Sequence, residues 1–210
     1  MPLYPVNLKV DGRQCTVIGG GQVALRKVES LLACGAAVKV VSPVLDKGFK
    51  KLSGRYEYVG RPYHRGDLDG SFLAIAATDD DQTNRAVEEE ARSRHMLLNV
   101  VDKPEQCNFY VPSVIRRGEL MITVSTGGGL PALSKRLRRQ LESQFPAEWS
   151  GALELLEKGR QRVLAGVKDE ERKSGCLSEL AALDLVAVMK TGGEAAAQAE
   201  IDECISRYLA

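Results

Sequence analysis

The sequence lacks a charge imbalance, a long apolar run and a targeting segment, and each absence excludes a class of protein. Its 29 basic and 28 acidic residues give a formal net charge of +1, which argues against a protein that relies on nucleic-acid phosphates for affinity. No apolar run approaches the roughly 18 residues that a membrane-spanning helix needs. The first residues, MPLYPVNLKVDG, lack the basic head and apolar core of a signal peptide. We therefore expect neither a nucleic-acid nor a membrane partner.

Cysteine and histidine are scarce and scattered. The two histidines, His64 and His95, lie in separate segments, and neither has a cysteine or histidine at ligand spacing. A resident zinc site is therefore not expected. The cysteines are odd in number and never spaced CxxC, which argues against a disulfide framework and favours a reducing cytoplasm. These five residues are Cys15, Cys34, Cys107, Cys176 and Cys204.

Short apolar strands alternate with helices through the first half of the chain. In the segment after the first strand, Ala24, Val28 and Leu31 recur at helical spacing, and Gly35 is placed to end that helix. Strands are predicted at 14–18, 38–41, 56–59, 71–78 and 97–102. This alternation predicts an α/β fold, a Rossmann-type doubly wound parallel sheet.

The pattern changes after about residue 108. Residues 109–126 read as two strands turned around Arg116-Arg117-Gly118, and a glycine loop then opens a basic helix. Residues 147–210 carry only helical patterning. We therefore expect a cofactor domain at 1–112, a small α+β dimerisation segment at 113–145 and a helical domain at 146–210.

The segment GGGQVA follows the first strand and opens a helix. Gly19, Gly21 and Ala24 fit the pattern G-x-G-x-x-G/A, in which the first glycine makes the turn and the second admits a pyrophosphate. The small third residue lets the helix pack on the sheet. The alternative interpretation is a glycine turn that merely connects packed elements.

The end of the second strand carries no acidic residue, although such a residue usually binds the adenosine ribose of a nicotinamide cofactor. Ser42, Pro43 and Val44 stand there instead. Only the Ser42 hydroxyl and backbone groups are available to the ribose, so NADP is not excluded on physical grounds.

Polar residues also end two later strands. Asp102 follows a central strand at the edge where open α/β sheets bind ligands, so it is a candidate general base. A turn or capping role is the alternative. Asn99 either orients a ligand or is a satisfied strand-end amide. Thr78 and Asp79 either reach the nicotinamide ribose or belong to a helix cap at Asp79 or Asp80.

The segment STGGG opens the basic helix. Helix N-termini and arginine side chains favour anions, so this region is a candidate binding site for substrate carboxylates. A solvated face on a dimerisation helix explains the same charges. The residues concerned are Ser125, Thr126, Gly127, Lys135, Arg136 and Arg139.

Four blocks in this order resemble the precorrin-2 dehydrogenase family, the dehydrogenase–ferrochelatase portion of siroheme synthases, in its free-standing form. The blocks are VIGGGQVALRKVESLLACGAAVKVVSP, AIAATDDDQTN, NVVDKPEQCNFYVPSVI and ITVSTGGGLPALSKRLR. The resemblance implies a homodimer that binds NAD over the glycine turn, at Gln22 and Val23, and again at Pro43 and Val44.

The resemblance also implies the reaction, which is oxidation of precorrin-2 to sirohydrochlorin with Asp102 as the catalytic residue. Some relatives insert ferrous iron as well, and Asp102 would then bind the iron transiently. Two alternatives stay open at this stage. One is an NAD-sensing regulatory module without turnover, and the other is a chelatase that uses no cofactor.

Overall fold

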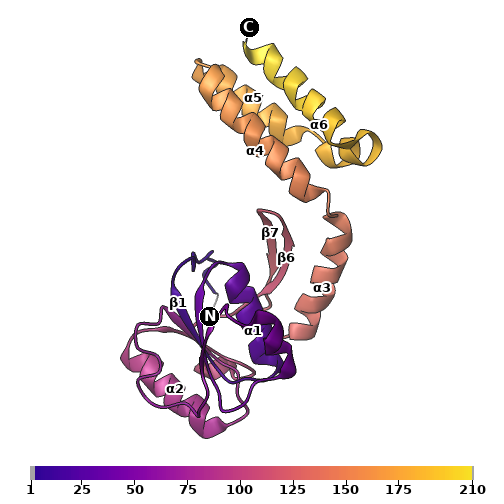
Figure 1. Ribbon diagram of the computed structural model, residues 1–210. Coiled ribbons are helices and arrows are strands. Elements are labelled where there is room, and N and C mark those ends of the chain that lie inside the picture. The colour runs from indigo at the N-terminus through magenta and orange to yellow at the C-terminus, as the bar shows by residue number, and fades with distance from the viewer. Residues whose placement is uncertain (1–2, 210) are drawn as a thin grey trace. The chain divides into compact units, whose positions relative to one another are not determined.

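The computed structural model describes residues 3–209 and forms two compact units, Met1–Val111 and Pro112–Ala210 (Figure 1). The first unit contains a parallel sheet in the order β3-β2-β1-β4-β5. Its strands are β1 (Gln14–Ile18), β2 (Ala37–Val41), β3 (Glu57–Val59), β4 (Leu73–Ala76) and β5 (Leu97–Val100). The order reverses at β1, so the prediction of a doubly wound Rossmann-type sheet is confirmed.

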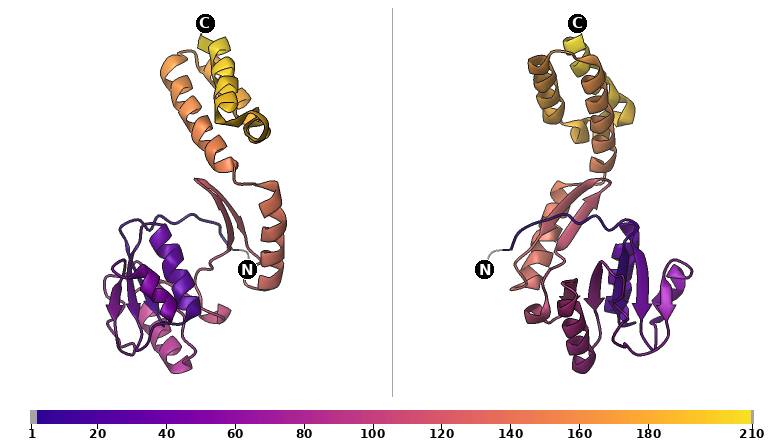
Figure 2. Two further views of the ribbon diagram at one scale, coloured as in Figure 1. Left: turned by 45° about the vertical axis from the view of Figure 1, so that its right-hand side comes forward. Right: turned by 90° about the vertical axis from the view of Figure 1, so that its left-hand side faces the viewer.

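Helices cover both faces of this sheet (Figures 1 and 2). α1 (Gln22–Ala33) packs through Ala24 and Val28 on a core that includes Val17, while α2 (Asp81–Ser93) packs on the opposite core with Ile18. Neighbouring residues of one strand therefore face different cores, as the pleat requires. Two short 3₁₀ helices, η1 (Lys47–Leu52) and η2 (Pro104–Gln106), complete the unit.

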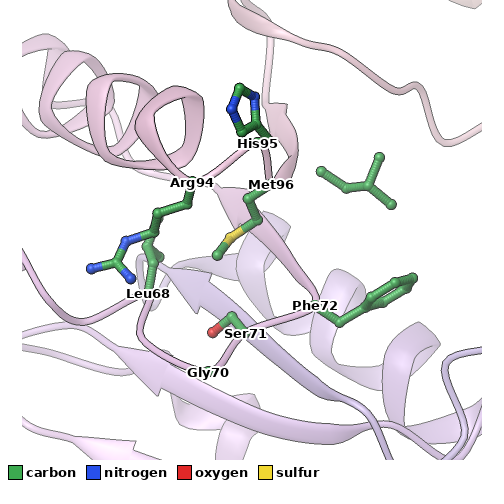
Figure 3. Close-up of a pocket in the computed structure, with 8 residues that line it drawn as sticks. Leu68, Gly70, Ser71, Phe72, Arg94, His95 and Met96 are labelled. Atoms are coloured by element: carbon green, nitrogen blue, oxygen red, sulfur yellow. The ribbon is translucent and has the colours of Figure 1, made fainter.

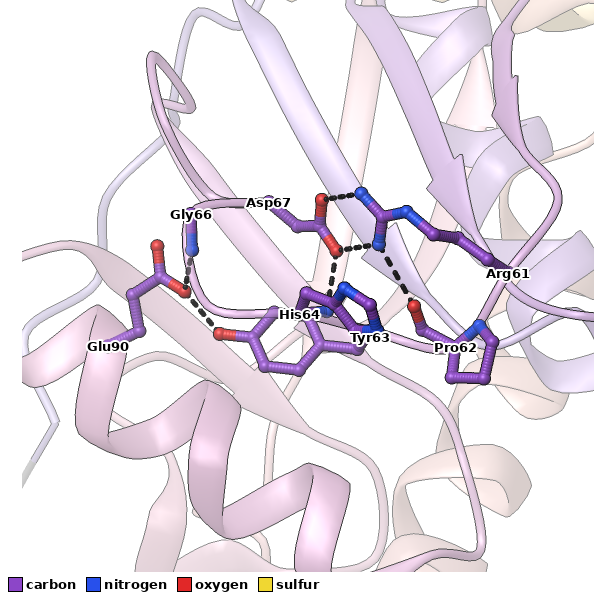
Figure 4. Close-up of polar contacts among 7 residues, drawn as sticks. All are labelled: Arg61, Pro62, Tyr63, His64, Gly66, Asp67 and Glu90. Carbon is purple, nitrogen blue, oxygen red and sulfur yellow. Dashed lines mark hydrogen bonds and ion pairs between the residues drawn. The ribbon is translucent and has the colours of Figure 1, made fainter.

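A polar cluster holds the loop between β3 and β4 (Figure 4). Arg61 donates two hydrogen bonds to Asp67, at 2.7 and 2.8 Å, and Asp67 also accepts the backbone N–H of His64. Glu90 of α2 is fully buried and accepts hydrogen bonds from the Tyr63 hydroxyl and from the Gly66 N–H. These bonds fasten the loop to the body of the unit because a buried carboxylate must keep its partners.

The second unit begins with a two-stranded antiparallel hairpin of β6 (Ser113–Arg117) and β7 (Leu120–Val124). The turn predicted at Arg116-Arg117-Gly118 includes Gly118 correctly but begins two residues too early. Arg116 and Arg117 belong to β6, and the turn is formed by Gly118 and Glu119. Gly118 has φ +58°, the left-handed conformation that the first residue of such a tight hairpin turn needs.

Four helices follow: α3 (Pro131–Gln144), α4 (Trp149–Gly166), α5 (Glu170–Ala182) and α6 (Leu185–Leu209). The hairpin packs on α3, while α4, α5 and α6 share a core of their own that includes Leu155, Leu180 and Ile201. Gly193 interrupts α6 with φ +74°. Among residues 3–209, no helix is long and apolar enough to cross a membrane.

Candidate active site

The glycine turn lies at the carboxyl end of β1, between the ends of β2 and β4. Gly19 donates a backbone hydrogen bond to Val41 and has φ +112°, and an added Cβ would lie 2.2 Å from the carbonyl oxygen of Ala77. A side chain at Gly20 would lie 2.0 Å from the carbonyl oxygen of Val44. Both glycines are therefore required by the fold itself.

Gly21 differs from Gly19 and Gly20, because nothing lies within 4 Å of the position that its Cβ would take. It is the N-cap of α1, and it supplies no side-chain hydrogen bond to the helix. The first turn of α1 also holds no acidic residue. The free N–H groups and the positive end of the helix dipole are left facing open space, which fits the pyrophosphate of a dinucleotide. Gln22 and Val23 begin this turn, and their contact with NAD stays a prediction.

The end of β2 presents apolar surface beside the turn. Val44 is 74% exposed, and Pro43 accepts a long 3.5 Å hydrogen bond from the Tyr58 hydroxyl. Ser42 is buried and donates its hydroxyl to the carbonyl of Val44. The Ser42 hydroxyl proton is thus used inside the loop, and its oxygen can only accept a hydrogen bond from a ribose.

The polar residues after β4 differ in whether they cap α2. Asp80 is the N-cap of α2 and accepts the N–H groups of Gln82 and Thr83. Thr78 accepts a 3.2 Å hydrogen bond from the Asp80 N–H. Asp79 is exposed and caps nothing. Of the two candidates for the cap, Asp80 is used and Asp79 is not, and a contact of Asp79 with the nicotinamide ribose stays a prediction.

Asp102 follows β5 at the same edge of the sheet. It is exposed and has φ +59°, one of two positive φ values among the non-glycine residues that the structure describes. The turn is closed by a 3.3 Å hydrogen bond from the Lys103 N–H to the Val100 carbonyl. Such strained positions are concentrated at functional sites.

Asn99 is buried in β5, two residues before that strained turn begins. Its amide donates 3.1 Å to the carbonyl of Phe109 and 3.5 Å to the sulfur of Cys107. These bonds hold the chain after β5 against the sheet. The geometry supports the interpretation of a satisfied strand amide, and a direct contact with a ligand stays a prediction.

The other predicted substrate residues belong to the second unit. Thr126 accepts the Leu130 N–H and pairs with the hydroxyl of Ser134, and the Ser125 hydroxyl accepts the N–H of Gly127. These contacts fix the loop at the start of α3. Three cations of α3 are exposed and form no ion pair with any residue from 3 to 209; they are Lys135, Arg136 and Arg139.

A pocket of about 340 Å³ lies at the other end of the sheet (Figure 3). It is lined by Ser71 and Phe72 before β4 and by His95 and Met96 before β5. His95 has φ +52° and follows the end of α2, where its N–H bonds to Arg92 and the next N–H bonds to Ala91. These bonds form a helix C-terminal motif. Since ligands of open α/β sheets bind at the carboxyl ends of strands, this pocket is separate from the candidate site.

Sequence reasoning missed two residues of the candidate site. Gly20 was given no role, although the close approach of Val44 requires a glycine there. Lys27 of α1 belongs to no motif in the sequence, yet its charge interacts with Asp102 and Cys107. Lys27 is spaced four residues from Val23 and from Leu31, and the structure shows all three half-buried, but this spacing does not indicate what the lysine lies beside.

Residues 6–113 match the family model described as "Putative NAD(P)-binding", which covers more than half of the chain. The chain belongs to this NAD(P)-binding family. The matched region contains the glycine turn, the end of β2 and Asp102.

Longer relatives extend the similarity. A siroheme synthase of Methylobacillus flagellatus is 42% identical over 79% of this chain, and one of Thioalkalivibrio sulfidiphilus is 38% identical over 100%. The chain spans 37% and 43% of the length of these relatives. A solved structure of SirC, precorrin-2 dehydrogenase, is 25% identical with a TM-score of 0.78, over 98% of this chain and 100% of that one. The resemblance predicted from the four sequence blocks is thereby confirmed.

Proposed function

We propose that this chain is an NAD-dependent precorrin-2 dehydrogenase that forms sirohydrochlorin. The observation that carries the proposal is Asp102, an exposed carboxylate held in a strained turn at the carboxyl edge of the sheet. It lies after β5, two strands from the uncapped helix N-terminus that follows β1. The proposed base thus lies at the same edge of the sheet as the cofactor turn, in a chain that belongs to an NAD(P)-binding family. The names of the relatives supply the substrate class.

The oxidation removes a hydride and a proton from the tetrapyrrole. Bound NAD supplies the hydride acceptor. Asp102 accepts the proton, since its exposed carboxylate lies at the edge of the sheet where the cofactor turn also lies. A positioned base of this kind accelerates a reaction by about 10²- to 10⁴-fold. The alternative role of Asp102, as a turn residue alone, is disfavoured because glycine would take φ +59° with less strain.

Cofactor affinity is distributed over several contacts. The uncapped N-terminus of α1 contributes about 0.3–1 kcal/mol for each favourable charge interaction. The apolar surface of Pro43 and Val44 and the free carboxylate of Asp79 contribute the remainder at the two ribose ends. The end of β2 has no acidic residue that would repel the 2′-phosphate of NADP. The preference for NAD over NADP is therefore part of the proposal.

Precorrin-2 carries many carboxylates, and the exposed cations of α3 are suited to bind them. Lys135 and Arg139 are four residues apart on one helix, and like charges at this spacing repel each other. A carboxylate bound between them would remove that cost. Lys135, Arg136 and Arg139 are proposed to bind substrate carboxylates, and the loop of Ser125, Thr126 and Gly127 positions the start of their helix.

The protein is further proposed to act as a homodimer. The hairpin is a two-stranded sheet, so both of its edges lack a strand partner among the described residues. Ile115 pairs with Ile122 on the face toward α3, whereas Val114 and Met121 lie on the opposite face and are only half-buried. A two-stranded ribbon is marginal alone, and pairing with a second copy would protect it.

The test is anaerobic incubation of the purified protein with enzymatically prepared precorrin-2 and either NAD⁺ or NADP⁺. The absorption spectrum of sirohydrochlorin is followed, and ferrous iron is then added. Product that requires NAD⁺ supports the dehydrogenase, and a further change above a protein-free control adds ferrochelation. Cofactor binding without oxidation would contradict the proposal and favour an NAD-sensing module.

A further inference from the structure

Lys27 occupies an unusual place on α1. Val23 and Leu31, one turn before and one turn after it, are also half-buried, whereas its neighbour Arg26 is exposed. This line of residues contacts the protein, because the adjacent Val28 is fully buried in the core beneath α1. A lysine in such a line places its charge close to the body of the unit instead of extending freely into water.

The segment after β5 lies near this lysine. Val101 and Phe109, which flank that segment, pack against the same core cluster as Val28. The Lys27 ammonium interacts electrostatically with Asp102 and with Cys107, both of which belong to the segment. Burial lowers the pKa of Lys27, the Arg26 cation lowers it further, and Cys107 and Asp102 oppose the change. Lys27 precedes Val28 and Asp102 follows Val101, and Val28 belongs to the core cluster against which Val101 packs, so the two charged residues adjoin one core.

Lys27 has no hydrogen bond or ion pair with any residue from 3 to 209. A partly desolvated ammonium without a directly bonded anion is costly, and an anionic ligand would lower that cost. The proposed substrate is a polycarboxylate, and the charge of Asp102 repels it. A cation beside Asp102 offsets that repulsion and attracts a substrate carboxylate to the site where the proton is removed.

We infer that Lys27 is a substrate-binding residue that anchors one carboxylate of the tetrapyrrole next to Asp102. The inference rests on the proposed dehydrogenase function and adds a specificity contact on α1, outside the loop and helix of the second unit. A compact ammonium suits this task because it donates to a carboxylate from several directions.

The test compares Lys27→Met, which keeps the length and apolar stem, with Lys27→Arg, which keeps the charge. Arg26→Met is the matched control, since Arg26 is the adjacent exposed cation. We expect Lys27→Met to raise KM for precorrin-2 by roughly 10- to 100-fold, as befits a lost charged hydrogen bond. Lys27→Arg should recover much of this loss. Arg26→Met should leave KM within about twofold, and every variant should keep the wild-type Kd for NAD⁺ and the wild-type Tm.

Two results would overturn the inference: an unchanged KM in Lys27→Met, or a raised Kd for NAD⁺, which would assign the lysine to the cofactor. Spectroscopic titration with sirohydrochlorin gives a second readout that needs no turnover. Weaker binding to Lys27→Met than to Arg26→Met supports the anchor, and equal binding refutes it. A wild type that binds sirohydrochlorin without oxidising precorrin-2 refutes the proposed function instead, so the two failures are distinguishable.

Discussion

At the scale of single residues, Asp102 combines an unfavourable backbone conformation with an exposed carboxylate. A left-handed residue other than glycine costs roughly 1–2 kcal/mol, less for aspartate, whose side chain bonds locally. Replacement by glycine would remove this strain. The folded state would then be at least as stable, but the carboxylate would be lost.

Asp102→Gly therefore separates structure from chemistry. We expect thermal unfolding at or above the wild-type temperature and a loss of about 10²- to 10⁴-fold in kcat, the range that a general base contributes. Asp102→Asn keeps the shape and should lose a similar factor. Calorimetry and anaerobic turnover assays measure the two effects. An Asp102→Gly protein with wild-type turnover would reduce Asp102 to a turn residue.

The glycine turn offers a matched pair of substitutions. Gly19→Ala places a Cβ 2.2 Å from a backbone oxygen at φ +112°, so we expect a large loss of stability, with Tm lower by several degrees. Gly21→Ala meets nothing within 4 Å and should keep the wild-type Tm. Its methyl group would occupy the space that faces the pyrophosphate, so Kd for NAD⁺ should rise by roughly tenfold or more.

Calorimetric titration with NAD⁺ and thermal unfolding check this pair together. If Gly21→Ala bound NAD⁺ as tightly as the wild type, the cofactor would lie elsewhere.

The positions of Gly19, Gly21 and Asp102 at the carboxyl edge of the sheet could be predicted because glycine turns and strand ends leave a local pattern in the sequence. Gly20 and Lys27 could not be assigned in the same way. Gly20 is required by the approach of Val44, which is distant in sequence, and Lys27 depends on the chain after β5 returning beside α1. Tertiary contacts of this kind have no local signal.

At the scale of elements, the loop between β3 and β4 depends on charge. The side chain of Asp67 is 10% exposed and its partner Arg61 is 42% exposed. The hydrogen bonds of Arg61 lower the pKa of Asp67 below its usual 3.8, and the N–H of His64 lowers it further. A carboxyl group whose folded pKa is depressed stabilises the fold above its unfolded pKa, and this stability is lost as pH falls through the folded value.

Asp67→Asn should lower the free energy of unfolding by about 1–2 kcal/mol at pH 7, the range for a charged hydrogen bond that is partly exposed. The difference from the wild type should be complete above about pH 5 and should shrink as pH falls below 3.8. Urea unfolding between pH 3 and pH 7 measures it. A difference that is independent of pH would show that packing, and not ionisation, is lost.

Elements were easier to predict than their exact ends. Apart from the exposed β3, the strands of the first unit are largely buried apolar runs, and α2 begins where Asp80 caps it. Arg116 and Arg117 are polar, and polar residues favour a turn, so the predicted turn begins too early. A half-buried hairpin has one face in solvent and therefore accepts polar residues within its strands. Arg117 also donates a 2.8 Å hydrogen bond to the carbonyl of Phe145, a contact that no local sequence pattern indicates.

At the scale of the whole molecule, the hairpin is the predicted contact between two copies. Val114→Glu places a charge on the half-buried face opposite α3, so we expect a dimer in the wild type and a monomer in the variant at micromolar concentration. Leu164→Glu is the control, since Leu164 is an apolar residue of α4 that is 41% exposed. Sedimentation velocity distinguishes the species. A monomeric wild type would contradict the dimer.

The measurement that tests the central claim most directly is a single-turnover reaction with excess protein, precorrin-2 and NAD⁺ under anaerobic conditions. NADH and sirohydrochlorin are quantified together in the wild type and in Asp102→Asn. The account predicts one NADH for each sirohydrochlorin in the wild type, and formation slowed by about 10²-fold or more in the variant. Sirohydrochlorin formed without NADH, or at equal rates in both proteins, would contradict a dehydrogenase that uses Asp102.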